Sequence, residues 1–134
     1  MDKKRVAYIA ATGLFSLAVL PGAVMDIAQP AMILEIVEPL GIPLHILTLI
    51  GIWKLLGIVG VAQQKSARVQ EWAYAGFFFD LTGAAWWHAG ANDPAGIAPP
   101  LVILAILGAS YAFRNAAPSS ASTASSSLPA GAMG

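Results

Sequence analysis

Four long apolar segments constrain the fold of this chain more than any other feature. They lie at about residues 6–28, 42–62, 69–91 and 97–113, and shorter connections that carry polar residues separate them. A helix rises about 1.5 Å per residue, so the longer segments can cross a hydrocarbon core of about 30 Å. The chain is therefore predicted to be an all-α integral membrane protein that forms a four-helix bundle.

The composition agrees with that class. Of the 134 residues, 57% are hydrophobic and 10% are charged, and the mean hydropathy is +0.71, whereas soluble domains carry about 25% charged residues. The lipid bilayer is thus the first expected partner. A net charge of zero gives no sign of nucleic-acid binding. The lack of cysteine excludes disulfides and thiolate metal sites in this chain.

The head, the first connection and the tail of the chain lie outside the apolar runs, and each predicts a different structure. The basic head Lys3–Arg5 before an apolar run would also suit a cleavable signal peptide, but the length of the run and the lack of a clear cleavage site favour a first span. Residues 29–41 carry apolar side chains at helical spacing, which predicts a short amphipathic helix at the membrane surface. Residues 116–134 are rich in Ser, Ala, Pro and Gly, which predicts a disordered tail after a membrane domain of residues 1–115.

The basic residues predict the orientation of the spans. Alternating four spans places six of them on one side of the membrane: Lys3, Lys4, Arg5, Lys65, Arg68 and Arg114. The charged residues of the opposite connections are all acidic: Glu35, Glu38 and Asp93. Because short cytoplasmic loops carry an excess of Lys and Arg, both termini are predicted to be cytoplasmic.

An ionisable residue in the third span is the clearest functional signal. Asp80 lies in the middle of the apolar run Glu71–His88, and an ionisable group in hydrocarbon costs about 2.5–3.5 kcal/mol even on lenient scales. Lys54 in the second span lies at a similar depth, about 12 Å from the inner end against about 16 Å for Asp80. We predict an Asp80–Lys54 ion pair, either structural or functional. Small residues that allow close helix packing flank both positions: Gly51, Gly57, Gly76 and Gly83.

A second polar set gathers toward the outer ends of the spans and is predicted to line a vestibule. Its members are Asp26, His45, His88, Asn92 and Asp93. His88 is the better candidate for a general acid or base, because it follows Asp80 on the same helix. No spacing places two metal ligands on one helix face, so a metal site is not predicted. Trp72 and the pair Trp86–Trp87 suit the aromatic belts at the two membrane surfaces, with ring stacking on a quinone as the alternative.

The successive motifs of the chain resemble those of the DoxX-like family of small four-span membrane proteins. They are P-G-x-x-M-D at 21–26, G-I-P-x7-G-x-W-K-x-x-G at 41–57 and E-W-A-Y-A-G-F-x-F-D at 71–80. The resemblance implies a four-helix bundle in a bacterial inner membrane, and for some members a link to quinone and to redox proteins. Together with the charge pattern it selects Asp80, His88 and Lys54 as candidate catalytic residues. The candidate binding residues are Asp26, His45, Trp53, Glu71 and Trp87.

Three classes of function remain open. The preferred one is an accessory or anchoring subunit of a membrane-associated, quinone-linked redox system. The second is a small membrane enzyme that acts on an apolar or quinone-like substrate through Asp80, Lys54 and His88. The third is a small transporter, which four short spans without an inverted repeat support least. Faces of small residues would also allow copies of the chain to associate.

Overall fold

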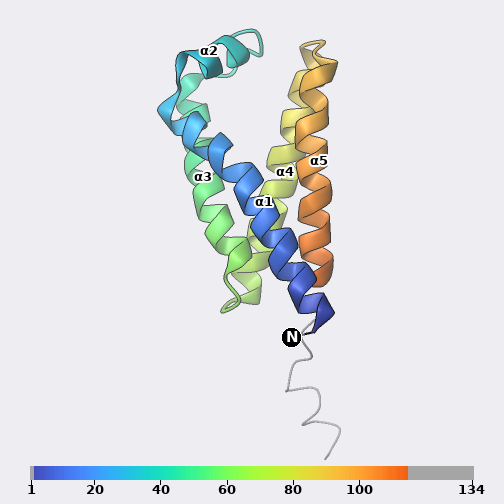
Figure 1. The fold of residues 1–134 in the computed structure, drawn as a ribbon. Helices are drawn as coiled ribbons and strands as arrows, with labels where there is room; N and C mark the ends of the chain where they lie inside the picture. The colour runs from blue at the N-terminus through green and yellow to red at the C-terminus, as the bar shows by residue number, and fades with distance from the viewer. Residues whose placement is uncertain (1, 115–134) are drawn as a thin grey trace, which may run out of the picture.

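The structure is a computed structural model that describes residues 2–114, and this part of the chain contains helices and no strand. Five helices follow one another in Figure 1: α1 (Lys3–Ala28), α2 (Ala31–Val37), α3 (Leu44–Ala62), α4 (Ala67–Gly90) and α5 (Pro94–Phe113). The all-helical class is confirmed, and α2 is the short helix expected between the first two spans. The predicted disordered tail, residues 116–134, lies outside the described residues.

Three of the described helices are long and apolar enough to cross a membrane, namely α1, α3 and α5. The fourth long helix, α4, is not among them. Its 24 residues include Glu71, Asp80 and His88. The long helix that is not among the three is thus the one that carries two of the candidate catalytic residues, Asp80 and His88.

Capping residues set the helix ends. Asp93 accepts a hydrogen bond from the backbone N–H of Gly96 at 3.1 Å, and Pro94 occupies the first turn, where its missing N–H costs nothing. As a result α5 starts three residues before the predicted start at residue 97. Ser66 caps α4 by accepting from the N–H of Val69 at 3.4 Å. Helix α1 continues through Pro21 and ends at Ala28. Gln29 follows as its C-terminal cap, with a left-handed backbone at φ 49°.

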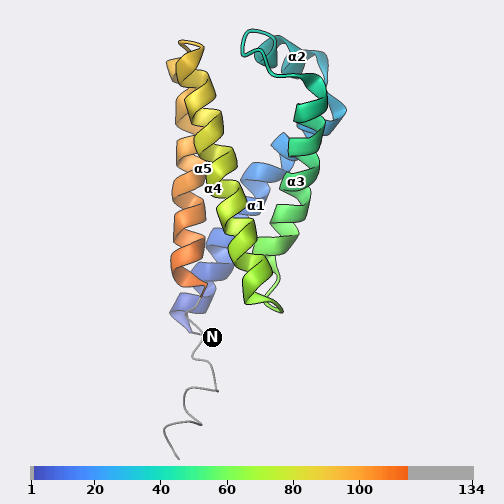
Figure 2. The same cartoon turned by 180° about the vertical axis from the view of Figure 1, so that it is seen from behind.

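The four long helices pack in a closed sequence of contacts. Helix α1 packs against α3 and α5, and α4 packs against the same two helices. Figure 2 shows that α3 and α4 converge toward the turn that joins them and separate toward the end that carries α2. The hydrophobic core includes Phe15, Phe77 and Leu107, and the rings of Phe15 and Phe77 meet edge to face at 4.8 Å.

Glycines on α3 allow this close packing. A side chain at Gly57 would begin 2.6 Å from the Phe77 ring, and one at Gly60 would begin 2.7 Å from the Ala73 side chain. The predicted role of Gly57 is therefore confirmed. Gly76 and Gly83 on α4 differ, since an added side chain at either would have nothing within 4 Å.

Two hydrogen-bonded groups that the sequence analysis did not single out are buried near the converging end. Tyr8 donates to the Val61 carbonyl at 2.8 Å, and the Gln70 amide donates to the Tyr8 hydroxyl and to the same carbonyl at 3.0 Å each. The Ser110 hydroxyl lies 2.6 Å from that of Thr12 and 2.7 Å from that of Tyr74. These neutral groups satisfy one another, as buried polar groups in folded proteins generally do.

The segments that carry six of the seven Lys and Arg residues lie at one end of the molecule. Figure 1 places the start of α1, the turn between α3 and α4 and the end of α5 at the same end, opposite α2. These are the three places where the six flanking Lys and Arg residues occur in the sequence.

Candidate functional site

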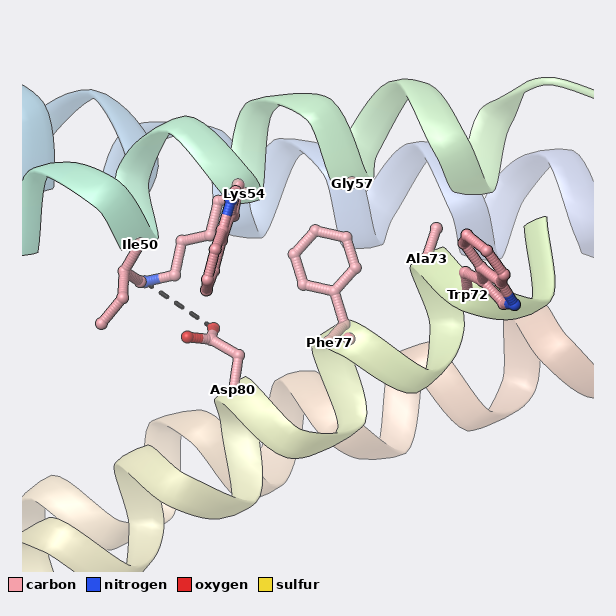
Figure 3. A pocket seen from close by; sticks show the side chains of 9 residues that line it. Ile50, Lys54, Gly57, Trp72, Ala73, Phe77 and Asp80 are labelled. Atoms are coloured by element: carbon pink, nitrogen blue, oxygen red, sulfur yellow. Dashed lines mark ion pairs between the residues drawn. The ribbon is translucent and has the colours of Figure 1, made fainter. Parts of the chain in front are cut away.

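Three ionisable side chains from three helices meet at one place. The ammonium of Lys54 on α3 donates to the Asp26 carboxylate of α1 at 2.8 Å, and it lies 3.8 Å from the nearer carboxylate oxygen of Asp80 on α4. All three side chains are largely buried, with exposed fractions of 21%, 11% and 24% for Lys54, Asp26 and Asp80. Figure 3 shows Lys54 and Asp80 facing each other across the space between their helices.

The predicted ion pair between Lys54 and Asp80 is confirmed as a 3.8 Å contact, but it is not the main contact of the lysine. Asp26, which was expected in the outer vestibule, is the hydrogen-bonded partner. The reason is the height at which α1 ends. The amide of Gln29 donates to the Leu44 carbonyl and to the Thr48 hydroxyl, so the end of α1 lies beside the first turns of α3 and not above them.

Local geometry brings Lys54 and Asp26 together. Helical side chains lean toward the N-terminus of their own helix, which directs the Lys54 stem back toward the end of α1. Figure 3 shows the Lys54 nitrogen beside Ile50, one turn earlier in α3. Close approach of α1 depends on Gly51, because a side chain there would begin 2.8 Å from the Ala23 carbonyl oxygen. The predicted role of Gly51 is confirmed by this contact.

A pocket of about 210 Å³ opens beside the charges, between α3 and α4. Lys54 and Asp80 are its charged residues, and most of its wall is apolar. The remaining lining residues are Ile50, Trp53, Gly57, Trp72, Ala73, Gly76 and Phe77. Trp53 and Trp72 are 62% and 73% exposed, so they stand at the mouth of the pocket, on the outer surface of the protein.

The sequence analysis selected Trp53 as a binding residue, whereas it preferred the belt at the membrane surface for Trp72 and kept ring stacking as the alternative. A signal for the shared pocket is present in the spacing. Trp72, Gly76 and Asp80 recur every four residues and therefore share one face of α4. On α3, residues 50, 53, 54 and 57 follow the corresponding spacing of three and four.

The two carboxylates of the site differ in how well they are satisfied. Asp26 receives a charge-assisted hydrogen bond from Lys54. Within residues 2–114 no hydrogen bond reaches the Asp80 carboxylate, whose nearest cation lies at 3.8 Å. With all three groups ionised, the site carries one positive and two negative charges. Asp80 is therefore the group that is free to interact with a bound molecule.

The candidate residue His88 lies apart from this site. Its Nδ1 is 2.9 Å from an Asp93 carboxylate oxygen, and the same carboxylate caps α5. His88 follows Asp80 by eight residues, roughly 12 Å along α4, and it does not line the pocket. The structure thus does not bring the two proposed acid-base residues together.

The remaining candidates occupy three separate places. His45 is exposed in the first turn of α3. The Trp87 indole donates to the Leu40 carbonyl and joins α4 to the segment after α2. Glu71 pairs with Arg114, whose guanidinium lies 4.2 Å from the centre of the Tyr111 ring. In the part of the chain that the structure describes, no three His, Asp or Glu side chains group as metal ligands would.

The fold and the site define the class: a helical membrane protein with several apolar helices and a cluster of charges between them. Its sequence matches the DoxX-like family over residues 10–110, and the chain belongs to that family. The matched region contains Asp26, Lys54 and Asp80. Comparison with curated proteins gave no match, and comparison with solved structures gave none either.

Proposed function

We propose that this protein is a membrane component of a quinone-linked redox system and that it binds the ring of a quinone-type amphiphile in the pocket between α3 and α4. The observation that carries the proposal is the pocket itself. Its apolar and aromatic wall and its single charged end, formed by Lys54 and Asp80, match a flat ring with oxygen substituents.

The position of the pocket suits a ligand that arrives from the bilayer. Trp53 and Trp72 at its mouth are among the most exposed apolar residues of the chain. An apolar tail can leave between them into lipid, while the ring lies against Phe77 and its oxygen atoms reach the charges. A volume of about 210 Å³ is sufficient for one substituted ring and insufficient for the tail.

The proposal includes a membrane topology. Helix α4, which packs against α3 and α5, forms a fourth span, so that the four long helices form a four-helix bundle in a bacterial inner membrane. The basic residues gathered at one end support cytoplasmic termini. The exposed glycines of α4, Gly76 and Gly83, would also permit pairing with a second copy.

The redox partner is a separate protein in this proposal. The chain has no cysteine that would carry a thiol relay, so a soluble or membrane redox protein would exchange electrons with the bound ring. The DoxX-like protein would position the ring and anchor the partner. His88 has no role in this proposal, because it is separated from Asp80 along α4.

Filling the pocket tests the ligand. Gly76 lines the pocket, and a Cβ atom added there would have nothing within 4 Å, so we expect a leucine at this position to occupy pocket space. The matched control is Gly83→Leu on the same helix, where an added Cβ atom also has nothing within 4 Å and which lies outside the pocket. Binding of a tetramethylquinone and of its hydroquinone to the protein in nanodiscs would be measured by calorimetry, with empty nanodiscs as the blank.

We expect Gly83→Leu to bind like the wild type and Gly76→Leu to lose most of the binding. Equal binding by both variants, or no binding by the wild type in either redox state, would overturn the proposed ligand.

The partner is tested by purification in mild detergent followed by identification of copurifying proteins and extracted small molecules. A redox protein in stoichiometric amount is expected. A protein that purifies alone with a stoichiometric ligand would overturn the accessory role and favour a membrane enzyme.

A further inference from the structure

The charged end of the pocket is asymmetric in hydrogen bonding. Lys54 directs one N–H to Asp26 at 2.8 Å, and its ammonium retains two further N–H groups. Asp80 accepts no hydrogen bond within the described residues, although it lies on the pocket wall. A ligand therefore meets a donor and an unsatisfied acceptor side by side, with 3.8 Å between their nearest atoms.

We infer that this pocket selects the reduced, hydroxyl-bearing form of its ligand, a quinol, over the oxidised quinone, with one hydroxyl bound between Lys54 and Asp80. The inference rests on the proposed function, because it concerns the same pocket and the same class of amphiphile. It adds a preference for one redox state and assigns that preference to one side chain.

The reason lies in what each oxygen can do. A hydroxyl oxygen accepts from Lys54 while its O–H donates to the Asp80 carboxylate, so both groups are satisfied at once. A quinone carbonyl only accepts. It can accept a hydrogen bond from Lys54, but it covers the Asp80 carboxylate and leaves that charge without a donor. Burying an unsatisfied acceptor costs free energy.

The neighbouring groups increase the contrast. Asp26 adds a second negative charge near Lys54, and the other lining residues of the pocket carry no side-chain hydrogen-bond donor except the two indoles at its mouth. Phe77, Gly57 and Gly76 provide only apolar contact to a ring. The rest of the pocket therefore cannot donate a hydrogen bond to the Asp80 carboxylate when the ligand lacks a donor.

Three ligands with the same ring separate donor from acceptor. They are tetramethylhydroquinone, its dimethyl ether and tetramethylquinone, whose full substitution prevents addition to amines. Binding would be measured by calorimetry without oxygen, with wild-type protein and with Asp80→Asn in nanodiscs. The ether retains the ring and both oxygens but cannot donate.

A hydrogen bond to a charged group corresponds to about tenfold or more in affinity. We therefore expect the wild type to bind the hydroquinone at least about tenfold more tightly than the ether and the quinone. In Asp80→Asn the amide can donate as well as accept, so the preference should fall to within about threefold. Gly76→Leu, which blocks the pocket without altering the charges, should lose the hydroquinone.

Equal affinity of the wild type for hydroquinone and ether would overturn the inference while leaving the proposed function standing, since a ring would still bind. An unchanged preference in Asp80→Asn would overturn it as well. Absence of binding by all three ligands would instead remove the proposed function. The comparison of ligands on wild-type protein does not depend on the folding of any variant.

Discussion

Polar side chains are hydrogen-bonded to different degrees at the converging end, where α3 and α4 meet at their turn, and toward the end that carries α2, where these helices separate. At the converging end, Tyr8, Gln70, Thr12, Tyr74 and Ser110 are neutral, buried and bonded to one another or to backbone. Beyond the Phe15–Phe77 contact, the site contains three ionisable groups with one hydrogen bond among them. The first region has the properties of structural support, whereas the second leaves an acceptor open to the pocket.

The comparison teaches how to separate structural from functional polarity in a small membrane protein. Both regions place polar side chains of α1 and α4 between helices, and composition alone would not distinguish them. The completeness of their hydrogen bonding distinguishes the two regions. A satisfied neutral network makes its helices adhere, while an incompletely satisfied charge is retained at a cost in stability that a binding role would explain.

Removing the shared cation should have the largest effect. Lys54→Met leaves the buried Asp26 carboxylate without its donor, and breaking a buried pair from one side costs about 3–5 kcal/mol. Unfolding in mixed detergent micelles, followed by circular dichroism, would report it. The double variant Asp26→Asn with Lys54→Met should lose clearly less than the sum of the single changes. Simple additivity would contradict the pairing.

Opening the satisfied network should have an intermediate effect. Ser110→Ala removes the hydroxyl that contacts both Thr12 and Tyr74, and an unsatisfied buried group costs about 1–3 kcal/mol. The same unfolding assay measures the loss, and ring binding in the pocket should remain within about twofold of the wild type. A variant that folds normally but loses the ligand would contradict the division between the two regions.

The two carboxylates should respond differently to the same substitution, and the smallest effect of all is expected at Asp80. Asp26→Asn loses a charge-assisted hydrogen bond and should cost about 1.5–3 kcal/mol. Asp80→Asn loses no hydrogen bond within the described residues, removes one of two negative charges, and should change the free energy of unfolding by less than about 1 kcal/mol. The reverse order of the two effects would show that Asp80, and not Asp26, holds the lysine.

Much of the architecture follows from the linear pattern. The apolar runs predicted four long helices to within a few residues, and the charged connections predicted that the turn between α3 and α4 and the end of α5 lie at the same end as the start of α1. Periodicity within a helix is a local property, so residues 72, 76 and 80 were already on one face before any packing was considered.

What the sequence by itself determined is therefore which segments are helices, in what order they run and which residues share a face. Tertiary structure alone decided that Asp26 meets Lys54. The physical reason is that the height of one helix against another depends on contacts between them. Gly51 against Ala23 and Gln29 against Leu44 set that height here, and no spacing along a single helix encodes it.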